Sequence, residues 1–223
     1  MLTVFVSCIQ SDLTSLQRKR ADWMYPIVFF FVFISLFGIG LGFDNQQLKA
    51  ASPAIIWITF LFITLSTIDT LFRREQEEGT LPQLVLCPYP LWWLLLAKAV
   101  TFWLVACLPL ILLTPLFGFI MQLSWQAILA LFLSLLVGSP ALALLGVVGA
   151  TLTCAMPRSG IFLAILLLPL YVPILILGES VAVNLQCLEN FSFQLALLGA
   201  ISAFAAIGAP HAAAGSLRAA MDE

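Results

Sequence analysis

Charged residues are scarce in this sequence, and their scarcity excludes most classes of soluble protein. Asp, Glu, Lys and Arg make up 9% of the chain, against roughly 25% in ordinary soluble domains. Hydrophobic residues make up 62% of the 223 residues, which is more apolar surface than one soluble core of this size can bury. The net charge is −2, and the sequence has no basic patch that could hold the phosphates of a nucleic acid. We therefore expect no nucleic-acid partner. Lipid is the solvent that fits this composition.

Residues that carry catalytic or metal-binding chemistry are also few. One histidine, His211, cannot form a catalytic triad, a metal cluster or a bis-histidine haem site within one chain. The five cysteines form no CxxC pair, which argues against a zinc site and a disulfide framework. The sequence contains no G-x-x-x-x-G-K-[ST] stretch to hold ATP phosphates, no CxxCH and no HExxH. We therefore expect a protein that is not an enzyme and that holds no metal or cofactor of its own.

His211 is the one candidate for an axial haem ligand, because imidazole is the usual choice. It lies near the end of the last apolar stretch, where a polar contact with a neighbouring helix explains it equally simply. We favour that second interpretation.

Long apolar stretches dominate what the sequence does contain. About 20 apolar residues suffice to cross a bilayer as a helix, and six stretches are long enough. We predict an all-α integral membrane protein with a single domain over residues 1–223. The predicted spans are 24–43, 53–72, 92–120, 125–153, 160–178 and 191–215. Pro109 and Pro115 predict breaks in the third span, and Gly138-Ser139-Pro140 predicts one in the fourth.

The distribution of Lys and Arg predicts the orientation. If the N-terminus lies in the cytoplasm, Lys49 is the one Lys or Arg that lies outside. We favour this orientation because Lys and Arg accumulate on the cytoplasmic side of membrane proteins. Six spans then place both termini in the cytoplasm. Residues 1–20 have apolar side chains at three- and four-residue spacing followed by a basic cluster, so we predict an amphipathic helix on the inner membrane surface.

Small residues mark the places where we expect helices to approach closely, because tight helix packing in lipid uses such residues. These places are Gly38 to Gly42, Gly146 with Ala150, Gly199 with Ala203, and Ala212 to Gly215.

The polar segment 73–90, between the second and third spans, has a helix-forming pattern. Gly79 suits the end of one helix, and Thr80 with Gln83 forms a T-x-x-Q capping box for the next. Pro88 and Pro90 end this second helix, which is too short to be stable alone in water. Its apolar residues are Leu81, Leu84 and Val85. We predict a docking partner for them, the alternative being a loop packed on its own bundle. The predicted interface comprises Glu77, Glu78, Gly79, Thr80, Leu81, Leu84 and Val85.

Charged and aromatic residues near this segment have simple structural interpretations. Asp69 and Arg73 have the four-residue spacing of a helical ion pair, although a carboxyl group inside a span can also serve proton or substrate transfer. We expect Lys98 to extend to the membrane surface and Trp92 with Trp93 to anchor there. Glu179 is expected in the outer loop before the last span.

The segment resembles the cytoplasmic loop of ABC-2-type export permeases, in which R-E-x-E-x-G-T-L-x-x-L is followed by proline. The residues that carry this resemblance are Arg74, Glu75, Glu77, Gly79, Thr80, Leu81, Leu84 and Pro88. A closer resemblance, to the heme exporter protein B (CcmB) family of cytochrome c maturation systems, covers the chain from about residue 20. It is carried by SPAIIWI at 52–58, LFRREQEEGTLPQLVLCPYPLWWLLLAK at 71–98, LPLILLTPL at 108–116 and SGIFLAILLLPLYVPILI at 159–176.

This resemblance implies the ABC-2-type exporter permease fold, a homodimer and a location in the bacterial inner membrane. It also implies partners: a cytoplasmic ABC ATPase subunit, a haem-handling membrane subunit, a small membrane subunit and a periplasmic haem chaperone. ATP would act through the partner, with haem as cargo or ATP hydrolysis linked to release of the loaded chaperone. The alternatives are a permease for a drug, lipid or polysaccharide, and a haem-holding scaffold that transports nothing.

Overall fold

The computed structural model describes residues 20–42, 46–69, 71–72, 89–154, 159–186 and 192–221, and six of its helical stretches are long and apolar enough to cross a membrane. The helices are α2 (Arg20–Leu41), α3 (Gln46–Ile68), α6 (Leu91–Phe102), the π-helix η1 (Trp103–Cys107), α7 (Leu108–Ile120), α8 (Trp125–Thr153), α9 (Ser159–Gln186) and α10 (Ser192–Met221). Helices α6, η1 and α7 together form the third span. The predicted all-α architecture with six spans is confirmed.

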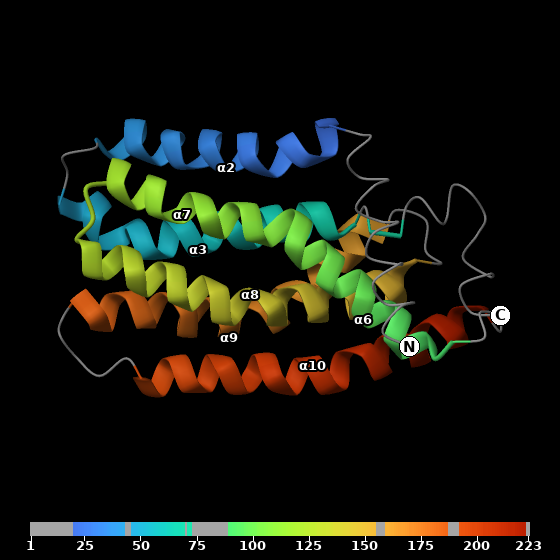
Figure 1. Ribbon diagram of the computed structural model, residues 1–223. Coiled ribbons are helices and arrows are strands. Elements are labelled where there is room, and N and C mark those ends of the chain that lie inside the picture. The colour runs from blue at the N-terminus through green and yellow to red at the C-terminus, as the bar shows by residue number, and fades with distance from the viewer. Residues whose placement is uncertain are drawn as a thin grey trace.

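Successive spans run in opposite directions, so the bundle has two ends (Figure 1). We call the end with Phe72, Tyr89, Cys154 and Met221 the loop end, because segment 73–88 joins the bundle there. We call the end with Leu41, Gln46 and the turn 121–124 the pocket end.

Helix α8 lies at the centre of the bundle. It packs mainly against α9 and α10 and also contacts α3, α6 and α7. Figure 1 shows α2 at one edge and α10 at the other. Most of α3 and α8 is buried within the chain, whereas α2, α9 and α10 leave most of their residues exposed. These exposed faces carry large apolar residues such as Phe31, Phe162 and Phe204, as expected for surfaces in contact with lipid or other membrane helices.

Three buried hydroxyl groups of α3 are satisfied within their own helix. In α3, Ser52 donates to the carbonyl of Leu48 at 2.6 Å, Thr59 to that of Ile55 at 2.6 Å, and Thr64 to that of Phe60 at 2.8 Å. Because lipid offers no alternative partner, an unsatisfied hydroxyl would be costly there. These hydroxyls therefore add polarity to α3 without opening the bundle to water.

The third span changes its helical register halfway. In η1 the N–H of Leu108 donates to the carbonyl of Trp103, five residues back, and Pro109 follows immediately. Proline has no N–H for the usual bond to the carbonyl four residues back, and the wider π turn accommodates this loss. The indole of Trp103 donates to Ser139 Oγ at 2.8 Å, next to Pro140 in α8. The irregular points of the third and fourth spans are thus joined, while α8 itself continues through Pro140 as one helix.

Trp57 of α3 is the largest fully buried side chain and lies in two notches formed by glycine. A Cβ at Gly138 of α8 would lie 2.8 Å from its Cη2, and a Cβ at Gly178 of α9 would overlap its ring. The indole N–H also donates to Ser134 Oγ at 3.2 Å. Trp57 therefore fixes α3 against both α8 and α9.

Only part of the expected small-residue packing occurs where we predicted it. Gly146 faces Ile68 and the hydroxyl of Tyr171 at 2.8–3.0 Å, measured from the position that a Cβ would take. No atom lies within 4 Å of the corresponding position at Gly40, Gly42 or Gly215. In the described part of the chain, no neighbouring helix therefore packs closely against these three glycines.

Several helix ends differ from the expected ones. Helix α3 begins at Gln46 and ends at Ile68, where we expected 53–72. Helix α9 continues to Gln186, so Glu179 lies within a helix and not in a loop. Hydropathy marks where apolar sequence ends, and a helix can continue past that point into the interface. The expected N-terminal helix at 1–20 lies outside the described residues, apart from Arg20 at the start of α2.

We predict that Gly178→Ala destabilises the protein, because the added methyl group would overlap the Trp57 ring. Overpacking of this kind typically costs about 1–3 kcal/mol. Thermal unfolding of the full-length chain in detergent measures the effect. The matched control is Gly208→Ala in α10, where the methyl group meets no atom within 4 Å. Equal unfolding temperatures for the two variants would contradict the role of Trp57.

Candidate coupling site

The predicted interface with a cytoplasmic partner belongs to the segment that leaves α3 and returns into α6 at the loop end. Glu77, Glu78, Gly79, Thr80, Leu81, Leu84, Val85 and also Arg73 lie outside the described residues. The structure describes the two points between which this segment is attached, at Phe72 and at Tyr89.

The first attachment begins where α3 ends. The N–H of Leu71 donates to the carbonyl of Ile68 at 3.0 Å, closing a turn after the last helical residue. The carboxylate of Asp69 lies beside Gly160, where a Cβ would be 3.2 Å from Oδ2. Gly160 is in the first turn of α9, whose free N–H groups and dipole favour a negative charge. Asp69 therefore holds the end of α3 against the start of α9.

The predicted Asp69–Arg73 ion pair stays a prediction, because Arg73 is outside the described residues. Sequence reasoning did not find the contact with Gly160. The two residues are 91 positions apart, and only a lone glycine at the start of a span hints at it.

Phe72 and Lys98 join the first attachment to α6. Phe72 is 3% exposed, and the ammonium group of Lys98 lies 5.4 Å from the centre of its ring. At this distance the cation is attracted to the face of the ring, more strongly where water is excluded. Lys98 itself is 7% exposed because other residues of the chain cover it, and its extension to the membrane surface stays a prediction. The end of α3 and the first turns of α6 are thus held together.

The second attachment is the start of α6. The N–H of Trp93 donates to the carbonyl of Pro90 at 3.0 Å, and Pro90 occupies the N-cap position. Trp92 contacts Trp93 edge to face, with ring centres 5.0 Å apart. On its other side, Trp92 stacks on His211 of α10 with ring centres 5.2 Å apart and planes inclined by 12°. The aromatic residues therefore connect α6 to α10 at the point where segment 73–88 re-enters the bundle.

His211 is held by its own helix as well as by this stack. Its Nδ1 lies 2.9 Å from the carbonyl oxygen of Ile207, so Nδ1 carries the proton and donates. The ring is exposed, its hydrogen bond stays within α10, and its contact with the neighbouring helix is the stack on Trp92, so an aromatic contact stands where we expected a polar one. A haem ligand at this position stays untested.

No group of three or more His, Cys, Asp or Glu side chains capable of holding a metal ion occurs within the described ranges. The described residues of the loop end provide attachment and aromatic packing.

Comparison with known proteins covers nearly the whole chain. The family model described as CcmB protein matches residues 3–220. The chain belongs to the CcmB family. The protein called Heme exporter protein B in Pseudomonas aeruginosa is 40% identical over 224 residues, covering 100% of both chains. Its counterpart in Haemophilus influenzae is 36% identical over 219 residues (98% of this chain, 99% of the relative), and that in Escherichia coli K12 is 36% identical over 201 residues (90% and 91%).

The match to the CcmB model covers every described helix up to residue 220, as well as segment 73–88. The attachments at Phe72 and Tyr89 therefore lie within the part of the chain that the family model matches.

We expect His211→Ala to lower the unfolding free energy of this CcmB chain by up to about 1 kcal/mol, because it removes one ring of a stacked pair. His211→Phe keeps a ring against Trp92 and serves as the matched control. Thermal unfolding and haem absorbance of the purified chain are measured together. A stoichiometric haem band in the unaltered chain that disappears in both variants would instead identify His211 as a haem ligand.

Proposed function

We propose that the chain is the permease subunit of an ABC transporter complex for cytochrome c biogenesis, located in the bacterial inner membrane. The observation that carries this proposal is full-length similarity to proteins called Heme exporter protein B. A separate cytoplasmic subunit hydrolyses ATP, and this chain couples hydrolysis to haem export or to release of the haem-loaded periplasmic chaperone. A haem-handling membrane subunit and a small membrane subunit complete the complex, in which this chain forms a homodimer. The exposed apolar faces of α2, α9 and α10 offer surface for these contacts.

In this proposal segment 73–90 is the coupling element between the ATPase and the bundle. Its pattern favours a short helix that needs a docking partner. Its two ends enter α3 and α6, which the Phe72–Lys98 contact holds together. A force on the segment would therefore move the ends of both helices at once. Because Trp57 is inserted between α8 and α9, a movement of α3 would reach the centre of the bundle.

This proposal requires the loop end to face the cytoplasm, and two native cysteines can test it. Cys87 belongs to segment 73–88, and Cys187 directly follows α9 at the pocket end. With the remaining cysteines replaced by alanine, a membrane-impermeant maleimide should label Cys187 from the periplasm. It should label Cys87 only after the inner membrane is permeabilised. The reverse pattern would overturn the orientation and the coupling role together.

The coupling role predicts that Leu81→Asp with Leu84→Asp abolishes co-purification of the ATPase while membrane insertion stays normal. Burying each leucine at an interface is worth roughly 1.5–3 kcal/mol, and a buried unpaired carboxylate adds a further penalty. Affinity purification of the complex and its ATPase rate are the measurements. Gly79→Val should give a milder defect. A glycine that ends a helix is expected to have a positive φ, and a β-branched residue fits poorly there.

The control Gln76→Asp adds a carboxylate at a polar position of the same segment, outside the predicted capping box, and should retain the ATPase. If the Leu81/Leu84 variant inserts normally and still binds the ATPase with normal hydrolysis, segment 73–90 is a cap of the bundle and not a coupling element.

A further inference from the structure

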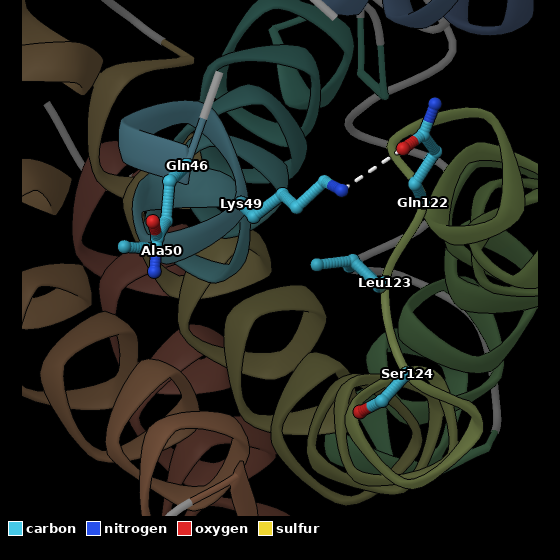
Figure 2. Close-up of a pocket in the computed structure, with 6 residues that line it drawn as sticks. All are labelled: Gln46, Lys49, Ala50, Gln122, Leu123 and Ser124. Atoms are coloured by element: carbon cyan, nitrogen blue, oxygen red, sulfur yellow. Dashed lines mark hydrogen bonds between the residues drawn. The ribbon is translucent and has the colours of Figure 1, made fainter. Parts of the chain in front are cut away.

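A pocket of about 360 Å³, lined by both polar and apolar residues, opens at the pocket end, between the start of α3 and the turn that leads into α8. Its lining, drawn in Figure 2, consists of Gln46, Lys49, Ala50, Gln122, Leu123 and Ser124. The volume is at the lower end of the range for small-molecule sites. The pocket lies at the end of the bundle opposite the candidate coupling site.

Lys49 occupies a position that its own helix disfavours. It is the fourth residue of α3, where the positive end of the helix dipole repels a cation. It is also the one Lys or Arg that the sequence places at this end of the spans. The contact that the structure gives its ammonium group is a neutral one, a hydrogen bond of 2.9 Å donated to Oε1 of Gln122 (Figure 2). A cation held in this way retains the capacity to bind an anion.

Gln122 is held in a backbone conformation that suits glycine better. Its φ is +54°, and it is the non-glycine residue with positive φ among those described. The turn ends α7 with the paired bonds of a Schellman motif, Leu123 N–H to Gly118 O at 2.9 Å and Gln122 N–H to Phe119 O at 3.0 Å. Glycine is the usual residue at that position. Glutamine there places an amide side chain against Lys49, at the mouth of the pocket.

A second helix begins at the same pocket. Ser124 caps α8 by accepting a hydrogen bond from the N–H of Ala127 at 3.3 Å, and its side chain lies on the pocket wall. The N-termini of α3 and α8 and one ammonium group therefore meet at this pocket, beside the C-terminus of α7. Around it, Phe119 is 78% exposed and Trp125 is 69% exposed, as expected for side chains at the edge of a membrane.

We propose that this pocket binds the acidic group, a carboxylate or a phosphate, of an amphiphile whose apolar part lies in the membrane. Lys49 supplies the charge, the amide of Gln46 supplies a further donor, and the exposed aromatic residues border the apolar part. Two sources share this chemistry: the propionate groups of haem and the phosphate of an anionic phospholipid. The haem source rests on the function proposed above, whereas the phospholipid source does not.

The test uses the purified full-length chain in neutral detergent, without the ATPase, so its result does not depend on coupling. Haem and haem dimethyl ester are titrated by absorbance, and retention of phosphatidylglycerol against phosphatidylcholine is measured by native mass spectrometry. We expect the unaltered chain to prefer the acid over the ester, or the anionic lipid over the neutral one. Lys49→Gln should reduce that preference about tenfold, and Lys49→Arg should preserve it. Arg218→Gln, at the loop end, is the control that removes the same charge elsewhere.

Loss of haem binding alone in Lys49→Gln identifies propionate as the ligand, loss of lipid retention alone identifies the phosphate, and loss of both shows a shared site. The proposal is overturned if the unaltered chain shows neither preference, a result that needs no variant. It is also overturned if Lys49→Gln, with normal thermal unfolding, binds both ligands like the unaltered chain, or if Arg218→Gln weakens binding equally. The function proposed above survives any of these failures, because they do not involve segment 73–90.

Discussion

The insertion of Trp57 between α8 and α9 is the contact on which the arrangement of the bundle depends. Water drives helices together in soluble proteins, but lipid tails are as apolar as the helices, so association in a membrane depends on close packing. Gly138 and Gly178 leave the space that the indole fills, and Ser134 accepts its N–H. Because Trp57 lies in the middle of α3, its insertion sets both the rotation and the depth of that helix.

Polar contacts between helices give the same bundle its register. The hydroxyl of Tyr171 in α9 donates to the carbonyl of Leu142 in α8 at 2.7 Å, and that of Ser202 in α10 donates to the carbonyl of Val137 at 2.5 Å. Together with the bond from Trp103 to Ser139, these contacts gather around the part of α8 that contains Pro140. In lipid a backbone group that loses its partner is costly, so a helix interrupted by proline needs its neighbours. The part of α8 around Pro140 is therefore the point where four spans are joined.

The sequence predicts those features of the fold that depend on composition and local pattern. The six spans follow from apolar length, and the break in the third follows from Pro109. Long-range contacts escaped prediction, because the glycines that receive Trp57 look like any other glycine in an apolar helix. We expected Gly138 to take part in a kink of the fourth span, and it also provides space into which Trp57 packs. Glu179 was misplaced for another reason: an acidic residue ends an apolar stretch but does not end a helix, and α9 continues through it.

The candidate site likewise has parts that the sequence predicts and parts that it does not. The capping box and apolar face of segment 73–90 are local signals, so the sequence alone suffices to propose a docking helix. Its attachments are not local, since Asp69 reaches Gly160 and Trp92 stacks on His211 only after the spans have assembled. The turn at Gln122 was missed because a positive φ at glutamine has no sequence signature.

Helix α3 connects the two ends of the molecule. Lys49 lies in the first turn of α3 at the pocket end and Asp69 directly follows its last residue at the loop end, about 30 Å away at the helical rise of about 1.5 Å per residue. A movement of α3 caused by a partner at segment 73–88 would carry Lys49 relative to the turn at Gln122, which belongs to a different span. If the pocket changes in this way, linkage requires the reverse effect, so an acidic ligand in the pocket must change the binding of the partner by the same factor.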